Sequence, residues 1–233
     1  MRIASHLRLW ILLGIVSIAM VSLGTLAAPG PPQTEVLDGI VARIEDDVIT
    51  WSELRELAAY QRLVDGRAQT NDELRSELIE QWVVNNEATA ARFPLPAETE
   101  VDREVAHVES SSRSAAAYQQ SLATVGLTSA TVRRIIRRQI YLARYLDYKF
   151  RSSIQIDDAA IENYYGDHLT PELQAKGQQA PPLEDVSAQI REVLIEQGIN
   201  DRSAAWFNET KPRLRIELEP MDAFATSTPG NQP

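Results

Sequence analysis

The sequence of 233 residues contains no cysteine and only three histidines, which lie far apart at positions 6, 107 and 168. A chain without cysteine forms no disulfide framework, no thiolate zinc site and no thiol nucleophile. Aromatic residues make up 6% of the chain, which disfavours a large aromatic-lined cofactor pocket. The sequence also has no glycine-rich phosphate loop. We therefore expect no cofactor and no metal, and catalysis is the weaker class of function for this chain.

Positive charge is scarce as well. The chain has 23 Lys and Arg against 33 Asp and Glu, which gives a formal net charge of −10 at pH 7. An acidic surface repels nucleic acid, so we expect no nucleic-acid partner. The same charge keeps an exported protein soluble. With 44% hydrophobic and 24% charged residues, the composition is otherwise that of an ordinary globular protein.

Residues 1–28 have the pattern of an export signal. Two arginines precede residues 9–28, which carry no charge, begin with an apolar centre and end in small residues. This order is typical of a secretory signal peptide, with cleavage after Ala27 or Ala28. The alternative is an uncleaved membrane anchor, since about 20 apolar residues span a bilayer. Both interpretations place the folded part outside the cytoplasm, after a proline-rich linker over residues 29–36.

The middle of the chain is predicted to be helical. Two capping boxes, Thr50 with Glu53 and Thr70 with Glu73, each open a helix. Apolar spacing and helix-ending residues predict helices over about 51–64, 71–92, 97–110, 114–125, 129–150 and 157–165, one turn after Thr170-Pro171, and a last helix from about Leu183. We expect Gly198 to kink or interrupt this last helix.

Strands are predicted only near the two ends of the mature chain. Residues 39–45 and the short stretch Val48-Ile49 form a hairpin, and residues 213–218 alternate strictly between polar and apolar side chains. Isolated short strands are unstable, so we expect residues 214–218 to pair with residues 40–44. The predicted fold is mainly α, with one small β-sheet formed by the N-terminal hairpin and the C-terminal strand. Residues 219–233 are predicted to be a disordered tail.

The helix predicted over 129–150 has two distinct faces. One face gathers the apolar residues Val132, Ile135, Ile136, Ala143, Leu146 and Phe150, as a helix facing the core should. The opposite face carries Tyr141, Tyr145 and Tyr148, flanked by Arg134, Arg137, Arg138 and Arg144. Residues 129–151 hold seven basic residues and one acid, in contrast to the acidic remainder of the chain.

The order of these segments resembles the SurA-type periplasmic chaperones and their secreted foldase relatives. The resemblance covers about residues 37–165 and again 183–218, and it rests on four degenerate motifs in the family's order: Leu37–Leu54, Glu73–Trp82, Pro94–Asp102 and Ile156–Tyr165. In the family, a parvulin isomerase domain usually follows the Tyr-Tyr helix. Here residues 166–182 intervene, which are too few for a domain of roughly 50 residues or more.

The resemblance implies an exported helical chaperone domain over residues 37–218, with a discontinuous core, 37–165 plus 183–218, and the short connection 166–182. It implies a periplasmic location and ATP-independent binding of unfolded or nascent envelope proteins, outer membrane proteins among them. It also implies no isomerase activity. A membrane tether through residues 9–28 and a homodimer made by arm exchange are further expectations. Isomerase-related activity through another site, or a role as an assembly factor for one partner, stay open as alternatives.

The three tyrosines and four arginines on the second face of helix 129–150 are the predicted client-binding residues. Tyrosine offers a large contact area and keeps a polar tip in water. Arginine stacks on aromatic rings and pairs with carboxylates. The competing interpretation is that the tyrosines pack beneath the C-terminal helix as a second layer of core, because a long central helix is often covered on two sides.

Overall fold

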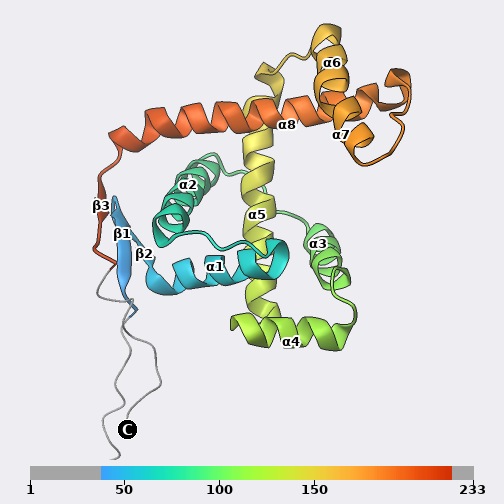
Figure 1. Ribbon diagram of the computed structural model, residues 1–233. Helices are drawn as coiled ribbons and strands as arrows, with labels where there is room; N and C mark the ends of the chain where they lie inside the picture. Colours follow the sequence, from blue (N-terminus) through green and yellow to red (C-terminus); the bar gives the residue numbers. More distant parts are fainter. Residues whose placement is uncertain (1–37, 222–233) are drawn as a thin grey trace, which may run out of the picture. The chain divides into compact units, whose positions relative to one another are not determined.

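The computed structural model describes residues 38–221 (Figure 1). The predicted signal segment 1–28, the linker 29–36 and residues 222–233 of the predicted tail lie outside the described residues. Within the described part, none of the helices is both long enough and apolar enough to span a membrane.

Helices dominate the described residues, which confirms the mainly α fold with a small β-sheet. The elements in chain order are β1 Ile40–Ile44, β2 Asp47–Thr50, α1 Trp51–Asp65, α2 Asn71–Ala90, α3 Glu98–Ser110, α4 Ala115–Val125, α5 Ser129–Phe150, η1 Arg151–Ser153, α6 Asp158–Tyr164, η2 Tyr165–Leu169, α7 Thr170–Ala175, α8 Leu183–Thr210, η3 Lys211–Arg213 and β3 Ile216–Leu218. Here η1 and η3 are 3₁₀ turns, and η2 is one π-helical turn.

The predicted capping boxes begin α1 and α2. The Glu53 backbone N–H donates to Thr50 Oγ1 at 3.3 Å, and the Thr50 N–H donates to Glu53 Oε2 at 3.0 Å. Thr70 and Glu73 repeat the arrangement at the start of α2. Each box satisfies two backbone donors that a helix N-terminus leaves without a partner. At the other end of α1, Gly66 takes the left-handed conformation, with φ of 64°, that favours glycine.

The two ends of the described chain meet in one antiparallel sheet with strand order β2-β1-β3. β3 pairs with β1 in the register Ala42 to Leu218, Arg43 to Glu217 and Ile44 to Ile216, which confirms the predicted pairing (Figure 1). The predicted strand is too long at its start, because Arg213 lies in the 3₁₀ turn η3 and β3 begins only at Ile216. Val41, Ala42 and Ile44 of β1 are fully buried beneath α1 and α2.

α5 packs against α1, α2, α3 and α8, but its buried side changes along its length. In its first half, Val132, Ile135 and Ile136 are buried with residues of α1, α3 and α4. In its second half, the buried residues are Tyr141, Leu142 and Tyr145, which pack on α2 and on Phe207 of α8. The predicted apolar face is therefore correct for the first half only. Beyond it Ala143 is exposed, whereas Leu146 and Phe150 are half-buried and Phe150 contacts the Trp206 ring of α8, with centroids 6.0 Å apart.

The prediction that Gly198 interrupts the last helix is wrong, because α8 runs unbroken from Leu183 to Thr210. A Cβ atom at residue 198 would lie only 3.0 Å from Cγ2 of Ile154 and 3.1 Å from its Cδ1. Glycine at this position therefore allows the segment after α5 to pack closely against α8. The short connection between α6 and α8 contains η2 and α7, and α7 begins at the predicted Thr170-Pro171 pair.

Removal of residues 213–233 should lower the free energy of unfolding by about 3 kcal/mol or more. Leu214 and Ile216 pack against the core cluster of β1, α1 and α2, and a buried aliphatic side chain contributes about 1.5–3 kcal/mol. Urea denaturation followed by far-UV circular dichroism measures the loss. A chain ending at Met221 keeps the pairing and is the matched control. Native-like stability of the shorter chain would contradict the contribution of β3.

Gly198→Ala should destabilise the protein by about 1 kcal/mol. Alanine gains about 1 kcal/mol over glycine inside a helix, but overpacking typically costs about 1–3 kcal/mol, and three atoms of Ile154 lie within 3.3 Å of the new Cβ. In an Ile154→Ala background, the same change should be neutral or stabilising. A double-mutant cycle in urea measures the coupling, and an increase in stability in the wild-type background would contradict the close-packing explanation.

Candidate functional site

The structure divides the three tyrosines that the sequence places on one face of α5. Tyr141 and Tyr145 are buried, with 7% and 6% of their surface exposed, whereas Tyr148 is 70% exposed. The two buried rings lie in one core cluster with Val83, Val84 and Ala88 of α2 and Phe207 of α8. A continuous exposed tyrosine stripe is therefore absent, and the burial agrees with the second layer of core. Client binding by these residues stays a prediction.

The hydroxyl groups of the buried tyrosines are satisfied within the protein. Tyr141 donates to the Phe93 carbonyl at 3.4 Å, and Tyr145 donates to Glu87 Oε2 at 3.0 Å. Burial, assisted by the hydrogen bond to Glu87, raises the pKa of Tyr145 to about 12. Lys149 pairs with the same Glu87 carboxylate at 2.7 Å. The polar ends of these side chains are thus used to join α5 to α2 and to the loop that follows α2.

Phe93 connects the buried tyrosines to the exposed one. Its ring centroid lies 5.4 Å from that of Tyr145 and 5.4 Å from that of Tyr148. The Arg144 guanidinium lies 5.8 Å from the centre of the Phe93 ring. Two residues further along the loop, Leu95 is 73% exposed. We call Phe93, Leu95, Arg144 and Tyr148 the Tyr148 patch.

Sequence reasoning identified Tyr148 and Arg144 but not the two apolar residues of the loop. Phe93 and Leu95 alternate with prolines, so the sequence predicts the end of a helix there, and residues 94–102 enter the family resemblance, but neither inference assigns the two side chains to a binding surface. Proline ends a helix and fixes a loop, so the same pattern also holds two large apolar side chains on a stiff segment. An apolar residue on either side of a proline in a loop is the signal that points to the patch.

The other predicted arginines are engaged by carboxylates of neighbouring helices. Arg134 pairs with Glu56 of α1, and Arg137 pairs with Glu98 of α3 at 2.8 Å. Arg138 has the loosest pair, 4.0 Å from Glu53 of α1. Arg144 also pairs, with Glu100 of α3 at 3.3 Å. The structure therefore brings Arg144 to the Tyr148 patch, while Arg134, Arg137 and Arg138 join α5 to α1 and α3.

Hydrogen bonds from α5 also lower the pKa of one carboxyl group of α3. Glu98 accepts from Arg133 at 2.6 Å and from Arg137, and these bonds lower the pKa of its carboxyl group. Asp102 accepts from Arg133 at 2.6 Å. Exposed ion pairs contribute little individually, about 0–1 kcal/mol, but here they share partners along one helix. They explain why α5 carries so many cations in an acidic chain.

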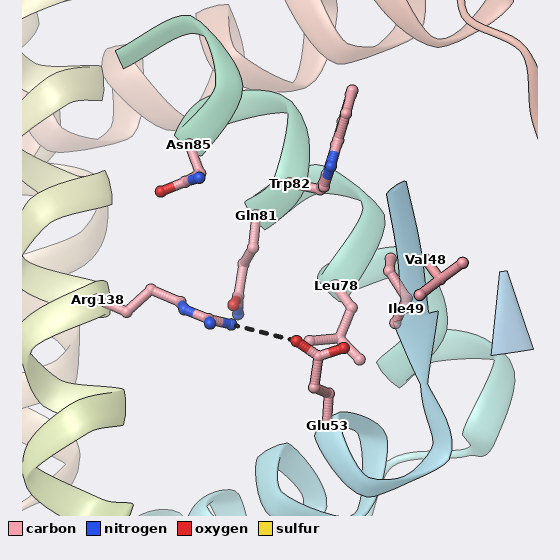
Figure 2. A pocket seen from close by; sticks show the side chains of 8 residues that line it. All are labelled: Val48, Ile49, Glu53, Leu78, Gln81, Trp82, Asn85 and Arg138. Carbon is pink, nitrogen blue, oxygen red and sulfur yellow. Dashed lines mark ion pairs between the residues drawn. The ribbon is translucent and has the colours of Figure 1, made fainter. Parts of the chain in front are cut away.

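A groove opens between β2, α1, α2 and α5 (Figure 2). We call it the β2 groove; it encloses about 110 Å³ and is lined by Val48, Ile49, Glu53, Leu78, Gln81, Trp82, Asn85 and Arg138. Its apolar wall comes from β2 and α2, and its polar wall combines two amides with the loose Arg138–Glu53 pair (Figure 2). Trp82 is held there by its Nε1–H, which donates to Asp47 Oδ2 at 2.9 Å.

The β2 groove lies beside a strand edge. Within residues 38–221, β2 pairs only with β1, so its other edge presents backbone donors and acceptors without a strand partner there. Amide and charged side chains next to such an edge offer both donors and acceptors to an extended peptide. Across the described residues, no three His, Asp or Glu side chains gather closely enough to hold a metal ion. The side chains that line the β2 groove offer hydrogen bonds and apolar contact.

Substitution of each tyrosine by serine should lower the free energy of unfolding strongly at the buried positions and only slightly at the exposed one. Tyr141→Ser and Tyr145→Ser should each lower the free energy of unfolding by about 3 kcal/mol, because the loss of a buried ring leaves a cavity. Tyr148→Ser should change it by less than about 0.5 kcal/mol, the usual range for an exposed position. Urea denaturation measures all three. A loss for Tyr148→Ser as large as that for Tyr145→Ser would show that Tyr148 belongs to the core.

Comparison with known proteins finds relatives that share one name. Chaperone SurA of Ralstonia nicotianae is 30% identical over 154 residues, covering 60% of this chain and 31% of the relative. Chaperone SurA of Chromobacterium violaceum is 29% identical, covering 62% of this chain and 35% of the relative. The match to Chaperone SurA of Cupriavidus metallidurans is longer, 209 residues at 25% identity, covering 86% of this chain and 41% of the relative.

These matches agree with the fold. No protein-family model matches the chain. The chain spans about a third of the length of the curated relatives it matches first. The longest of the three alignments extends over most of the chain, and the structure joins both predicted parts of the resemblance in one sheet. On the evidence of its sequence relatives, this chain is a SurA-like protein.

Proposed function

We propose that this protein is an exported, ATP-independent chaperone that transiently holds unfolded envelope or outer membrane proteins. The observation that carries the proposal is the Tyr148 patch. Tyr148 and Leu95 are large apolar side chains that remain mostly exposed. The Phe93 ring contacts Tyr148 and packs against the core cluster, so it joins Tyr148 to the core. The relatives named Chaperone SurA support a chaperone-like role.

The patch suits weak and reversible binding. A client segment that covers the Tyr148 ring gains apolar contact, about 25 cal/mol for each Å² removed from water. Arg144 adds a cation beside the Phe93 ring, which favours aromatic and acidic client side chains. Because no nucleotide step resets the protein in this mechanism, release depends on fast dissociation. A small patch of a few side chains is consistent with that requirement.

The β2 groove offers a second contact for the same clients. An extended segment adds to the free edge of β2 through its main chain, while its alternate side chains meet Val48 and Trp82. Strands of outer membrane barrels alternate apolar and polar residues, so they fit a site of this kind. Main-chain recognition of this type is independent of client sequence, as a chaperone requires.

Location and assembly follow from the sequence. The pattern of residues 1–28 supports export to the periplasm as a signal peptide, or a tether to the inner membrane as an anchor. Exchange of arms between two copies would give a homodimer. Residues 166–182, which separate α6 from α8, support a role without a parvulin domain and therefore without isomerase activity. The alternatives are an isomerase-related activity at another site, or an assembly factor for one partner.

The mature protein should suppress the aggregation of a refolding outer membrane protein, measured by light scattering. A Leu95→Ser and Tyr148→Ser double variant should lose at least half of this suppression, since it removes the two most exposed apolar side chains of the patch. Val64→Ser is the matched control, because Val64 is exposed at the end of α1, away from the patch.

Two outcomes would contradict the proposal, one for the binding surface and one for the chaperone function. Full suppression by the double variant would remove the patch from the binding surface, whereas no suppression by the unmodified protein would contradict chaperone function itself. A rate of proline isomerisation above the uncatalysed rate would favour the isomerase-related alternative. Crosslinking in cells that recovers a single protein would favour the dedicated assembly factor.

A further inference from the structure

A second groove runs between α1 and α4, apart from the Tyr148 patch. It consists of two adjoining hollows of about 480 and 420 Å³, which share Arg62 and Val125. From α1, the groove is lined by Arg55, Ala59, Arg62 and Leu63. On the side of α4, Val125 and the following Leu127 contribute apolar side chains, and Gln120, Ser121 and Thr124 contribute polar ones. The α1 residues are spaced i, i+4, i+7 and i+8, so they occupy one face of the helix.

The two arginines of this groove have no carboxylate partner. Neither Arg55 nor Arg62 forms an ion pair with any residue in the range 38–221, and Arg55 donates only to Ser52 Oγ at 3.4 Å. The one carboxylate that lines the groove is Glu56, and it is already paired with Arg134 of α5. In contrast, the arginines of α5 are all engaged by carboxylates.

Several described arginines form no ion pair, Arg103 and Arg202 among them, but Arg55 and Arg62 are the ones that line this groove. Both are exposed on the rim, while Ala59 and Leu127 are buried in the floor and Leu63 and Val125 are half-buried between them. Arg55 and Arg62 are seven positions apart on the helix, a rise of about 10 Å. The groove therefore presents two positive charges two turns apart above an apolar floor.

We propose that this groove binds an acidic amphipathic helix of a partner protein. Two carboxylates seven residues apart on the partner pair with Arg55 and Arg62, and apolar side chains between them lie over Leu63 and Val125. Arginine binds carboxylates in a forked geometry that a lysine does not reproduce. A groove between two packed helices accepts a third helix by the ordinary rules of helix packing. This inference does not depend on the proposed chaperone function.

The test uses a fluorescent synthetic helical peptide with two Glu seven residues apart and Leu between them. It should bind the mature protein, and binding measured by fluorescence anisotropy should weaken at least tenfold for Arg55→Glu with Arg62→Glu. Arg103→Glu with Arg202→Glu makes the same change of net charge on α3 and α8 and is the matched control. A peptide with Lys in place of both Glu should not bind, and Arg55→Lys with Arg62→Lys should weaken binding by less than the charge reversal.

Three outcomes would overturn the proposal. The first is equal binding by the charge-reversed variant and the unmodified protein, and the second is an equal loss in the control variant. The third is that the protein binds vesicles containing phosphatidylglycerol but not the peptide, and that charge reversal abolishes the vesicle binding. That result would assign the groove to an anionic membrane surface. Suppression of client aggregation should be unchanged by Arg55→Glu with Arg62→Glu, so a failure here is distinguishable from a failure of the Tyr148 patch.

Discussion

The antiparallel pairing of β3 with β1 is the interaction on which the rest of the structure depends. It joins residues more than 170 positions apart and thereby returns the end of α8 to the start of the chain. Because α8 returns, Phe207 and Leu214 reach α2 and the second half of α5. Their contact buries Tyr141 and Tyr145 and leaves Tyr148 as the exposed member of the three. The shape of the candidate binding surface is thus a consequence of closing the sheet.

The ion pairs of α5 with α1 and α3 also depend on how the helices pack. The helix carries arginines toward α1 and α3, and Glu56, Glu98 and Glu100 meet them there. Arg55 and Arg62 of α1, which line the groove between α1 and α4, form no ion pair with any residue in the range 38–221. The arrangement separates two surfaces of different chemistry. One is aromatic and lies beside the loop after α2, and the other is cationic and lies between α1 and α4.

Much of the local structure could be predicted because its causes are local. The boxes at Thr50 and Thr70 need only residues three positions apart, and Gly66 ends α1 through its own backbone. Gly198 shows the limit of such reasoning. Its helix propensity alone indicates a break, but its role is to admit Ile154 against α8, and that contact joins segments about 44 positions apart. Phe93 shows the same limit, since the sequence around it does not indicate that its ring packs against Tyr145 and Tyr148 of α5.

The amino-acid sequence by itself determined the helical class, the helix starts, the pairing of the two terminal strands and the family resemblance. Apolar periodicity, helix capping and segment order depend on residues that are close in sequence or on their order, so they can be recognised without a structure. Tertiary structure alone decided which side of α5 is buried at each level, which arginines are neutralised and which remain free. Those properties depend on the helices that pack around α5. A helix with apolar, aromatic and cationic residues on several sides offers more than one buried face, and only its neighbours select between them.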